Sequence, residues 1–155
     1  MSPSRRAVIG AALTAVTTLW SGCGSRAEDS CERTPAQSPV EARLVGPDAE
    51  RTLFDRAAVT RVGSVRAHQG ATVFDVELSE PTRADVREHF RSLDVVDRPD
   101  RFEVAVVEAD RVVARFRVQH SLVDRVASGD WNGTVRLTFE DNSTAKSLHE
   151  RFRCG

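Results

Sequence analysis

The sequence has almost no net charge, because its 155 residues hold 22 Lys and Arg against 23 Asp and Glu, for a formal charge of -1 at pH 7. Nucleic acids and anionic lipid surfaces select basic domains or basic patches, so the charge balance argues against both. A hydrophobic share of 40% is typical of a chain that buries a core. The length leaves room for one domain and a tail, which excludes a multidomain enzyme.

Motifs of common catalytic sites are also missing. There is no G-x-S-x-G elbow, no H-E-x-x-H pair and no glycine-rich phosphate loop. The four histidines fall singly, never at the close spacing of a zinc ligand pair. Asp75 and Glu77 share one face of a predicted strand, as paired carboxylates in acid–base chemistry do, but an ordinary solvated sheet face explains them as well. We therefore expect no enzyme activity, no metal and no cofactor.

The chain begins with the three parts of a signal peptide. Arg5 and Arg6 precede an apolar run at 7–20 that is shorter than the ~20 residues a membrane-spanning helix needs, and small residues follow it. We expect a signal peptide at 1–22. The paired arginines resemble a twin-arginine export signal, which carries proteins that fold before crossing the membrane. The alternative is an ordinary signal peptide that starts with two arginines.

Ser21 and Gly22 before Cys23 resemble a lipoprotein cleavage box, in which the new N-terminal cysteine takes a lipid on sulfur. The box departs from the pattern, because Trp20 stands where Leu is usual. We expect a mature chain that starts at Cys23, anchored by lipid to the outer face of the cytoplasmic membrane. The alternative is a secreted protein with a chance cysteine. Residues 23–39 are small, charged or proline-rich, which predicts a flexible tether.

Two further cysteines, Cys31 and Cys154, lie outside the cytoplasm on this prediction. Cysteines in an oxidising compartment usually pair, so we expect a disulfide between the end of the tether and the last turn of the chain. The alternative is two unpaired thiols on mobile ends.

From residue 40 the apolar residues alternate with a period of two and then switch to helical spacing. Strands are predicted at 40–45, 51–54, 73–78, 102–106, 112–118 and 135–139, helices at 79–93 and 142–152, and a short helical piece at 121–126. Ser79 is expected to cap the first helix, and Asn142 or Ser143 the last. Strands with one apolar face and two helices to cover them predict an α+β two-layer sandwich with a mostly antiparallel sheet over 40–155.

Residues 74–155 carry a further pattern. Its parts are the strand Val76-Glu77-Leu78 before a helix, the hairpin 104–113, the loop around Gly129 and Gly133, the strand Leu137-Thr138-Phe139, the helix with Ala145 and Leu148, and the terminal Gly155. The pattern resembles the head subdomain of the first periplasmic domain of SecD, the membrane-anchored accessory of the Sec protein translocase. The hairpin turn Glu108-Ala109-Asp110 departs from the tight Asp-Gly usual in that family.

The resemblance implies a stand-alone SecD head on a lipid tether that contacts translocon components or unfolded exported polypeptides. The membrane helices that couple the proton gradient to export in SecD have no counterpart in this sequence. We therefore expect a binding module that assists protein export and performs no transport itself. The alternative is a surface lipoprotein that binds an unrelated small ligand or protein and shares only the fold.

One surface feature is a candidate binding face. Arg111, Arg115 and Arg117 alternate with apolar residues along a predicted strand, and Arg136 on a neighbouring strand is expected to continue the row. Such a face suits an acidic partner, an anionic headgroup or an extended polypeptide. The alternative is a solvated face whose arginines pair with carboxylates across strands. Trp131 lies in a turn-rich loop and is either an exposed contact or a lid on the core.

Overall fold

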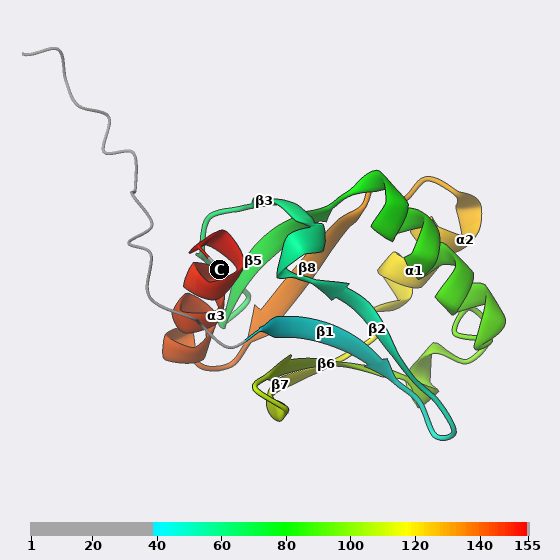
Figure 1. The fold of residues 1–155 in the computed structure, drawn as a ribbon, viewed down its shortest axis with the longest axis horizontal. Helices are drawn as coiled ribbons and strands as arrows, with labels where there is room; N and C mark the ends of the chain where they lie inside the picture. The colour runs from blue at the N-terminus through cyan, green and yellow to red at the C-terminus, as the bar shows by residue number, and fades with distance from the viewer. Residues whose placement is uncertain (1–38, 155) are drawn as a thin grey trace, which may run out of the picture. The chain divides into compact units, whose positions relative to one another are not determined.

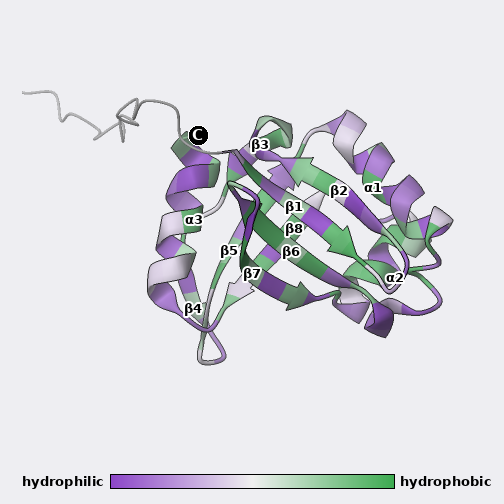
Figure 2. Ribbon diagram, turned by 60° about the horizontal axis from the view of Figure 1, so that its bottom comes forward, coloured by the Kyte–Doolittle hydropathy of each residue, from purple (hydrophilic) through white to green (hydrophobic). Residues whose placement is uncertain are grey.

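The computed structural model describes residues 39–154, which form an α+β fold of eight strands, three α-helices and two short 3-10 turns (Figure 1). The strands divide into two antiparallel sheets. Figure 2 shows hydrophobic and hydrophilic residues alternating along them. This alternation gives each strand one face for the core, because successive side chains of a strand point to opposite sides.

The first sheet has the strand order β2-β1-β6-β7. Its strands are β1 (Val40–Val45), β2 (Glu50–Asp55), β6 (Glu103–Glu108) and β7 (Arg111–Arg117). Val40, Ala42 and Leu44 are the buried residues of β1. Ala42 stands opposite Val106 of β6 and Leu44 opposite Val104, so the two central strands turn their apolar residues to the same side.

The second sheet is built around β5. Its strands are β3 (Val59–Val62), β4 (Arg66–His68), β5 (Ala71–Leu78) and β8 (Thr134–Phe139). Val76 pairs with Val62 of β3 and Val135 of β8, whereas Val73 pairs with Arg66 of β4 and Thr138 of β8. A strand residue has one neighbour on each side, so β3 and β4 share one edge of β5 and β8 takes the other.

The helices are α1 (Glu80–Ser92), α2 (His120–Ser128) and α3 (Asn142–Cys154). Pro81 sits in the first turn of α1, where its missing N–H costs nothing. Gly129 ends α2 in the left-handed conformation, with φ 84°. Figure 1 shows α1 and α2 together at one end of the sheets and α3 at the other.

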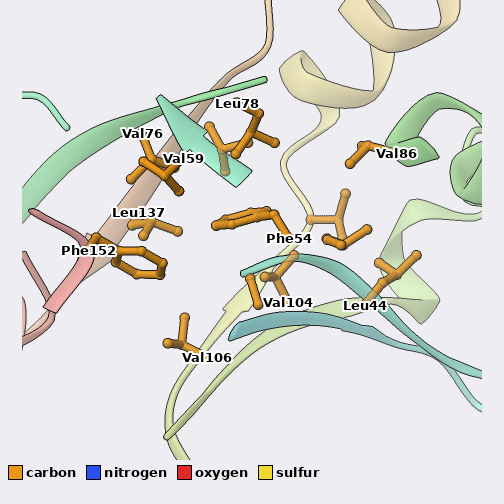
Figure 3. Close-up of a cluster of buried hydrophobic side chains, with 14 of the residues drawn as sticks. Leu44, Phe54, Val59, Val76, Leu78, Val86, Val104, Val106, Leu137 and Phe152 are labelled. Atoms are coloured by element: carbon orange, nitrogen blue, oxygen red, sulfur yellow. The ribbon is translucent and has the colours of Figure 1, made fainter. Parts of the chain in front are cut away.

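One hydrophobic core joins the two sheets and all three helices. Phe54 of β2, Val104 of β6 and Phe152 of α3 meet Val76 and Leu137 of the second sheet there (Figure 3). Aromatic rings dominate its centre. Phe74 stacks on Phe139 with ring centroids 5.4 Å apart, and Phe152 lies 6.1 Å from Phe54 and 6.4 Å from Phe74. The C-terminal helix is therefore part of the core.

The predicted α+β class and the antiparallel pairing are confirmed. The prediction of a single sheet was wrong, because residues 39–154 contain two sheets, and the short helical piece predicted at 121–126 is a third helix, α2, that packs on the core beside the two predicted covering helices. The cap of the last helix was also wrong. Asp141 performs it, accepting hydrogen bonds from the Thr144 backbone N–H at 2.8 Å and from the Ser143 hydroxyl at 2.7 Å. These bonds hold the pKa of the Asp141 carboxyl well below its ordinary value.

Candidate functional site

Two strand edges face each other without pairing. Among the described residues β7 pairs only with β6, and β8 only with β5. Phe116 of β7 meets Phe139 of β8 edge to face, with ring centroids 5.1 Å apart. Beyond this contact a groove runs between the two strands and α2. Val118, Leu122 and Leu137 supply apolar lining, and Arg117, Arg125 and Arg136 supply cationic lining. We call this the edge groove.

The three arginines of the edge groove differ in their partners. Arg136 donates from Nε to Oδ1 of Asp75 at 2.9 Å, which raises the pKa of the Arg136 guanidinium. Arg125 donates from Nε to the Ser121 carbonyl at 3.1 Å. Neither Arg117 nor Arg125 has an ion pair within residues 39–154. The groove therefore carries two arginines, Arg117 and Arg125, that form no ion pair with a carboxylate of residues 39–154.

The hydrogen-bonding capacity of the groove comes from its backbone. An edge strand presents a row of unpaired N–H and C=O groups that can pair with an extended chain. Pairing between two copies of β7 is disfavoured, because Arg115 and Arg117 would meet arginines of the second copy. An acidic or neutral extended segment meets no such repulsion.

The structure separates the arginines that the sequence pattern grouped. A register shift between Val106 and Val107 leaves Val113 of β7 without a partner on β6. Arg111 consequently stands opposite Glu108, which is on the same face of β6 as Val106. Arg115 stands opposite Ala105, which is on the other face. The prediction that Arg111 shares a face with the other two was wrong, because the extra residue reverses the alternation.

The remaining arginines of the predicted face divide between two environments. Arg115 pairs with Glu103 across the outer face of the first sheet, with 3.3 Å between Nη1 and Oε2. Arg117 and Arg136 both line the edge groove, although they belong to different sheets. The packing of the two sheets against each other, rather than the alternation within one strand, places both arginines in the groove. Arg125 was not predicted, because no local pattern marks it; it reaches the groove because α2 follows β7.

Trp131 is a lid on the core and no part of an exposed face. Its side chain is 2% exposed. The indole Nε1 donates to the Thr134 carbonyl at 2.9 Å, and Arg87 donates from Nη2 to the Trp131 carbonyl at 3.1 Å. Including Trp131 in the binding face was therefore wrong, and the reading of it as a lid is the one the burial supports.

Four predicted sites lie outside the described residues: Arg5 and Arg6 of the export signal, the lipidation site Cys23, and Cys31. Cys154 is described and ends α3, but its predicted pairing with Cys31 stays a prediction. Residues 39–154 contain no cluster of three or more His, Cys, Asp or Glu side chains able to hold a metal ion. No helix within that range is long and apolar enough to cross a membrane.

No protein-family model matches the sequence. No curated protein matches it either. Comparison with solved structures shows that the fold is SecD-like. A structure described as that of "a membrane component SecDF that enhances protein export" aligns with a TM-score of 0.51 at 12% sequence identity. The alignment covers 77% of this chain and 63% of that one. The likeness confirms the predicted resemblance to SecD at the level of the fold.

Proposed function

We propose that this protein is a lipid-anchored domain that binds extended segments of exported polypeptides in the edge groove and so assists protein export at the outer face of the cytoplasmic membrane. The observation that carries the proposal is the pair of unpaired strand edges, β7 and β8, on either side of an apolar groove with arginines at its rim. The SecD-like fold supports it, because the solved relative is described as enhancing protein export.

Binding begins with the backbone. An extended segment laid along β8 or β7 pairs its N–H and C=O groups with those of the strand edge, as in recognition by strand addition. Main-chain hydrogen bonds are the same for every sequence. A binding mode of this kind suits a partner population as varied as exported chains.

The groove then selects among segments by side chain. Its hollow measures about 50 Å³, so it admits one apolar side chain while the rest of the segment lies along the strand edge. Arg117 and Arg125 stand at the rim without a carboxylate partner in the described chain. Acidic side chains on either side of the apolar one are therefore attracted to the groove, and basic ones are repelled.

Site-specific photo-crosslinking in native membranes tests this proposal. Gln119 lines the groove and is exposed, so a photoreactive residue there should give adducts with translocon subunits or with a range of exported chains. The matched control is Asp48, an exposed residue of the β1–β2 turn that lies outside the groove. Adducts should be abundant from position 119 and scarce from position 48.

Charge variants sharpen the same experiment. The double variant Arg117→Gln and Arg125→Gln removes the unpaired cations of the groove and should reduce the adducts from position 119. The control is Arg51→Gln with Arg98→Gln, two exposed arginines outside the groove. A single unrelated adduct, or equal yields from both positions, would refute the proposal and favour a surface lipoprotein that shares only the SecD-like fold.

A further inference from the structure

A second concave site lies on the second sheet, on the face turned away from the core. It is a polar hollow of about 410 Å³. The lining residues that determine its chemistry include Arg61, Gly63, Ser64, Arg66, Asp75 and Asn132. We call it the β5 hollow, because β5 forms its floor. None of the edge-groove arginines lines it.

Strand register explains why charged side chains gather there. Residues directly opposite each other in a sheet point to the same face. Asp75 of β5 stands opposite Arg136 of β8, and Val73 stands opposite Arg66 of β4. Arg61 of β3 stands opposite Glu77, two residues further along β5. Arginines from three strands therefore lie on one face around Asp75.

Gly63 creates the space. Its N–H donates to the Asp75 carbonyl at 2.7 Å where β3 ends, and a Cβ at this position would lie 3.7 Å from the Cβ of Asp75. Gly63 is not among the glycines with positive φ, so its backbone conformation does not require a glycine. What the missing side chain provides is room beside Asp75.

Arg61 and Arg66 line the hollow together with Asp75 and Glu77, and Arg136 of the edge groove adds a third guanidinium group at Asp75. Asp75 accepts from Arg66 Nη2 at 2.7 Å and from Arg136 Nε at 2.9 Å, so one carboxylate serves two guanidinium groups. Burial acts to raise the pKa of Asp75, but these two hydrogen bonds outweigh it and hold that pKa below the ordinary value. Arg61 has no ion pair within residues 39–154.

The other carboxylate of the hollow, Glu77, has its ion-pair partner outside the hollow. Arg83 of α1 lies 3.5 Å from it, between Nη2 and Oε1, and also pairs with Glu80 at 3.2 Å. Arg66 and Arg136 thus share the single charge of Asp75. Each guanidinium has five N–H donors, and Arg66 and Arg136 each use one of them on Asp75. Donors remain for an incoming anion.

We propose that the β5 hollow binds a phosphate ester that carries hydroxyl groups. A tetrahedral phosphate offers oxygens to several guanidinium groups at once, and the planar fork of arginine N–H donors matches its geometry. The volume falls in the range of small-molecule sites and leaves space for an organic group beside the phosphate. The hydroxyls of Ser64 and Thr134 and the amide of Asn132 supply neutral hydrogen-bonding groups for that organic part.

The effect of replacing Asp75 distinguishes a role in binding from a purely structural role. Its carboxylate is the internal counterion that an incoming phosphate must compete with for Arg66 and Arg136. Asp75→Asn keeps the shape and removes the competing charge, so this variant binds phosphate esters more tightly. Arg61→Gln and Arg66→Gln bind them more weakly. A residue that only supported the sheet would weaken binding when changed.

Titration of the full chain with glycerol 3-phosphate tests the proposal. Binding is measured from the shifts of the arginine Nε–H resonances in NMR spectra, and glycerol is the uncharged control. Arg61→Gln and Arg66→Gln should each weaken binding about fivefold, the equivalent of about 1 kcal/mol. Asp75→Asn should strengthen binding, Gly63→Val should weaken it by narrowing the hollow beside Asp75, and Arg98→Gln, remote from the site, should leave it unchanged. Thermal unfolding confirms that each variant is folded.

Vesicles distinguish the two sources of such an ester. Binding to phosphatidylglycerol vesicles but not phosphatidylcholine vesicles, displaced by glycerol 3-phosphate, identifies a lipid headgroup. Binding of glycerol 3-phosphate without vesicle binding identifies a soluble ester. The proposal is overturned if neither probe binds, or if Asp75→Asn weakens binding as the arginine variants do. Arg61→Gln and Arg66→Gln change no residue of the edge groove, so their result stands apart from the crosslinking result; Asp75→Asn releases Arg136, which lines the edge groove, and is therefore used only in the phosphate-ester titration.

Discussion

Replacing Phe152 by Ala is predicted to remove about 3–5 kcal/mol from the free energy of unfolding. The side chain is fully buried and lies between Phe54 of the first sheet and Phe74 of the second. Its loss leaves a cavity that aromatic neighbours on two separate sheets cannot fill without moving the sheets, which places the cost toward the upper end. Small domains are stable by only about 5–15 kcal/mol, so the variant should lose a large part of its stability.

The assay is urea unfolding of the full chain followed by tryptophan fluorescence, because Trp131 lies in the same core. The matched control is Lys146→Ala, an exposed residue of the same helix, which should change the unfolding free energy by less than about 0.5 kcal/mol. A loss below about 1 kcal/mol for Phe152→Ala would refute the argument that α3 closes the core. It would mean that the two sheets hold together without the C-terminal helix.

Three further changes test other parts of the fold by the same unfolding assay. Gly133→Ala should destabilise by more than about 1 kcal/mol, because Gly133 has φ 87° and a Cβ there would meet Arg83, whose Nε donates to the Leu78 carbonyl. Ala109→Asn should stabilise by about 0.5–1 kcal/mol, because Ala109 has φ 48° in a two-residue hairpin turn that favours Asn. Asp141→Ala should destabilise at neutral pH and not in strong acid. Because the pKa of Asp141 is lower in the folded state, its cap adds to the free energy of unfolding at pH values above the unfolded-state pKa of about 4. That contribution is lost as the pH falls through the folded-state pKa of Asp141. Equal unfolding curves for Asp141→Ala and the parent at neutral pH would contradict the capping role.

The alternation of apolar and polar residues predicted the strands well, because it depends only on neighbouring residues and each strand buries one face. Phe74, Val76 and Leu78 of β5 are all fully buried, as their spacing indicated. The hairpin between β6 and β7 was also predicted, and its two turn residues, Ala109 and Asp110, adopt positive φ without a glycine.

The errors arose where a single residue or a tertiary contact decides the outcome. Val113 has no partner on β6, and this bulge places Arg111 on the other face of the sheet; no sequence pattern predicts such a bulge. Ser79 occupies the cap position of α1 as predicted, but its hydroxyl bonds with Thr82 Oγ1 rather than with the backbone. The division into two sheets depends on which strands pair, and the position of Arg117 and Arg136 in one groove depends on how the two sheets pack. Local alternation contains information about neither.

The pairing of β1 with β6 has a consequence for the order in which the chain is completed. Val40 pairs with Glu108, and the whole second sheet except β8 lies between them in the sequence. The first sheet therefore cannot close until β6 has been synthesised, and such distant pairing is slow because a long loop must close first. A chain that threads outward as it is made would present β1 to the far side of the membrane long before its partner arrives. On the expected twin-arginine route the strand waits in the cytoplasm, and the domain crosses with its sheet already closed.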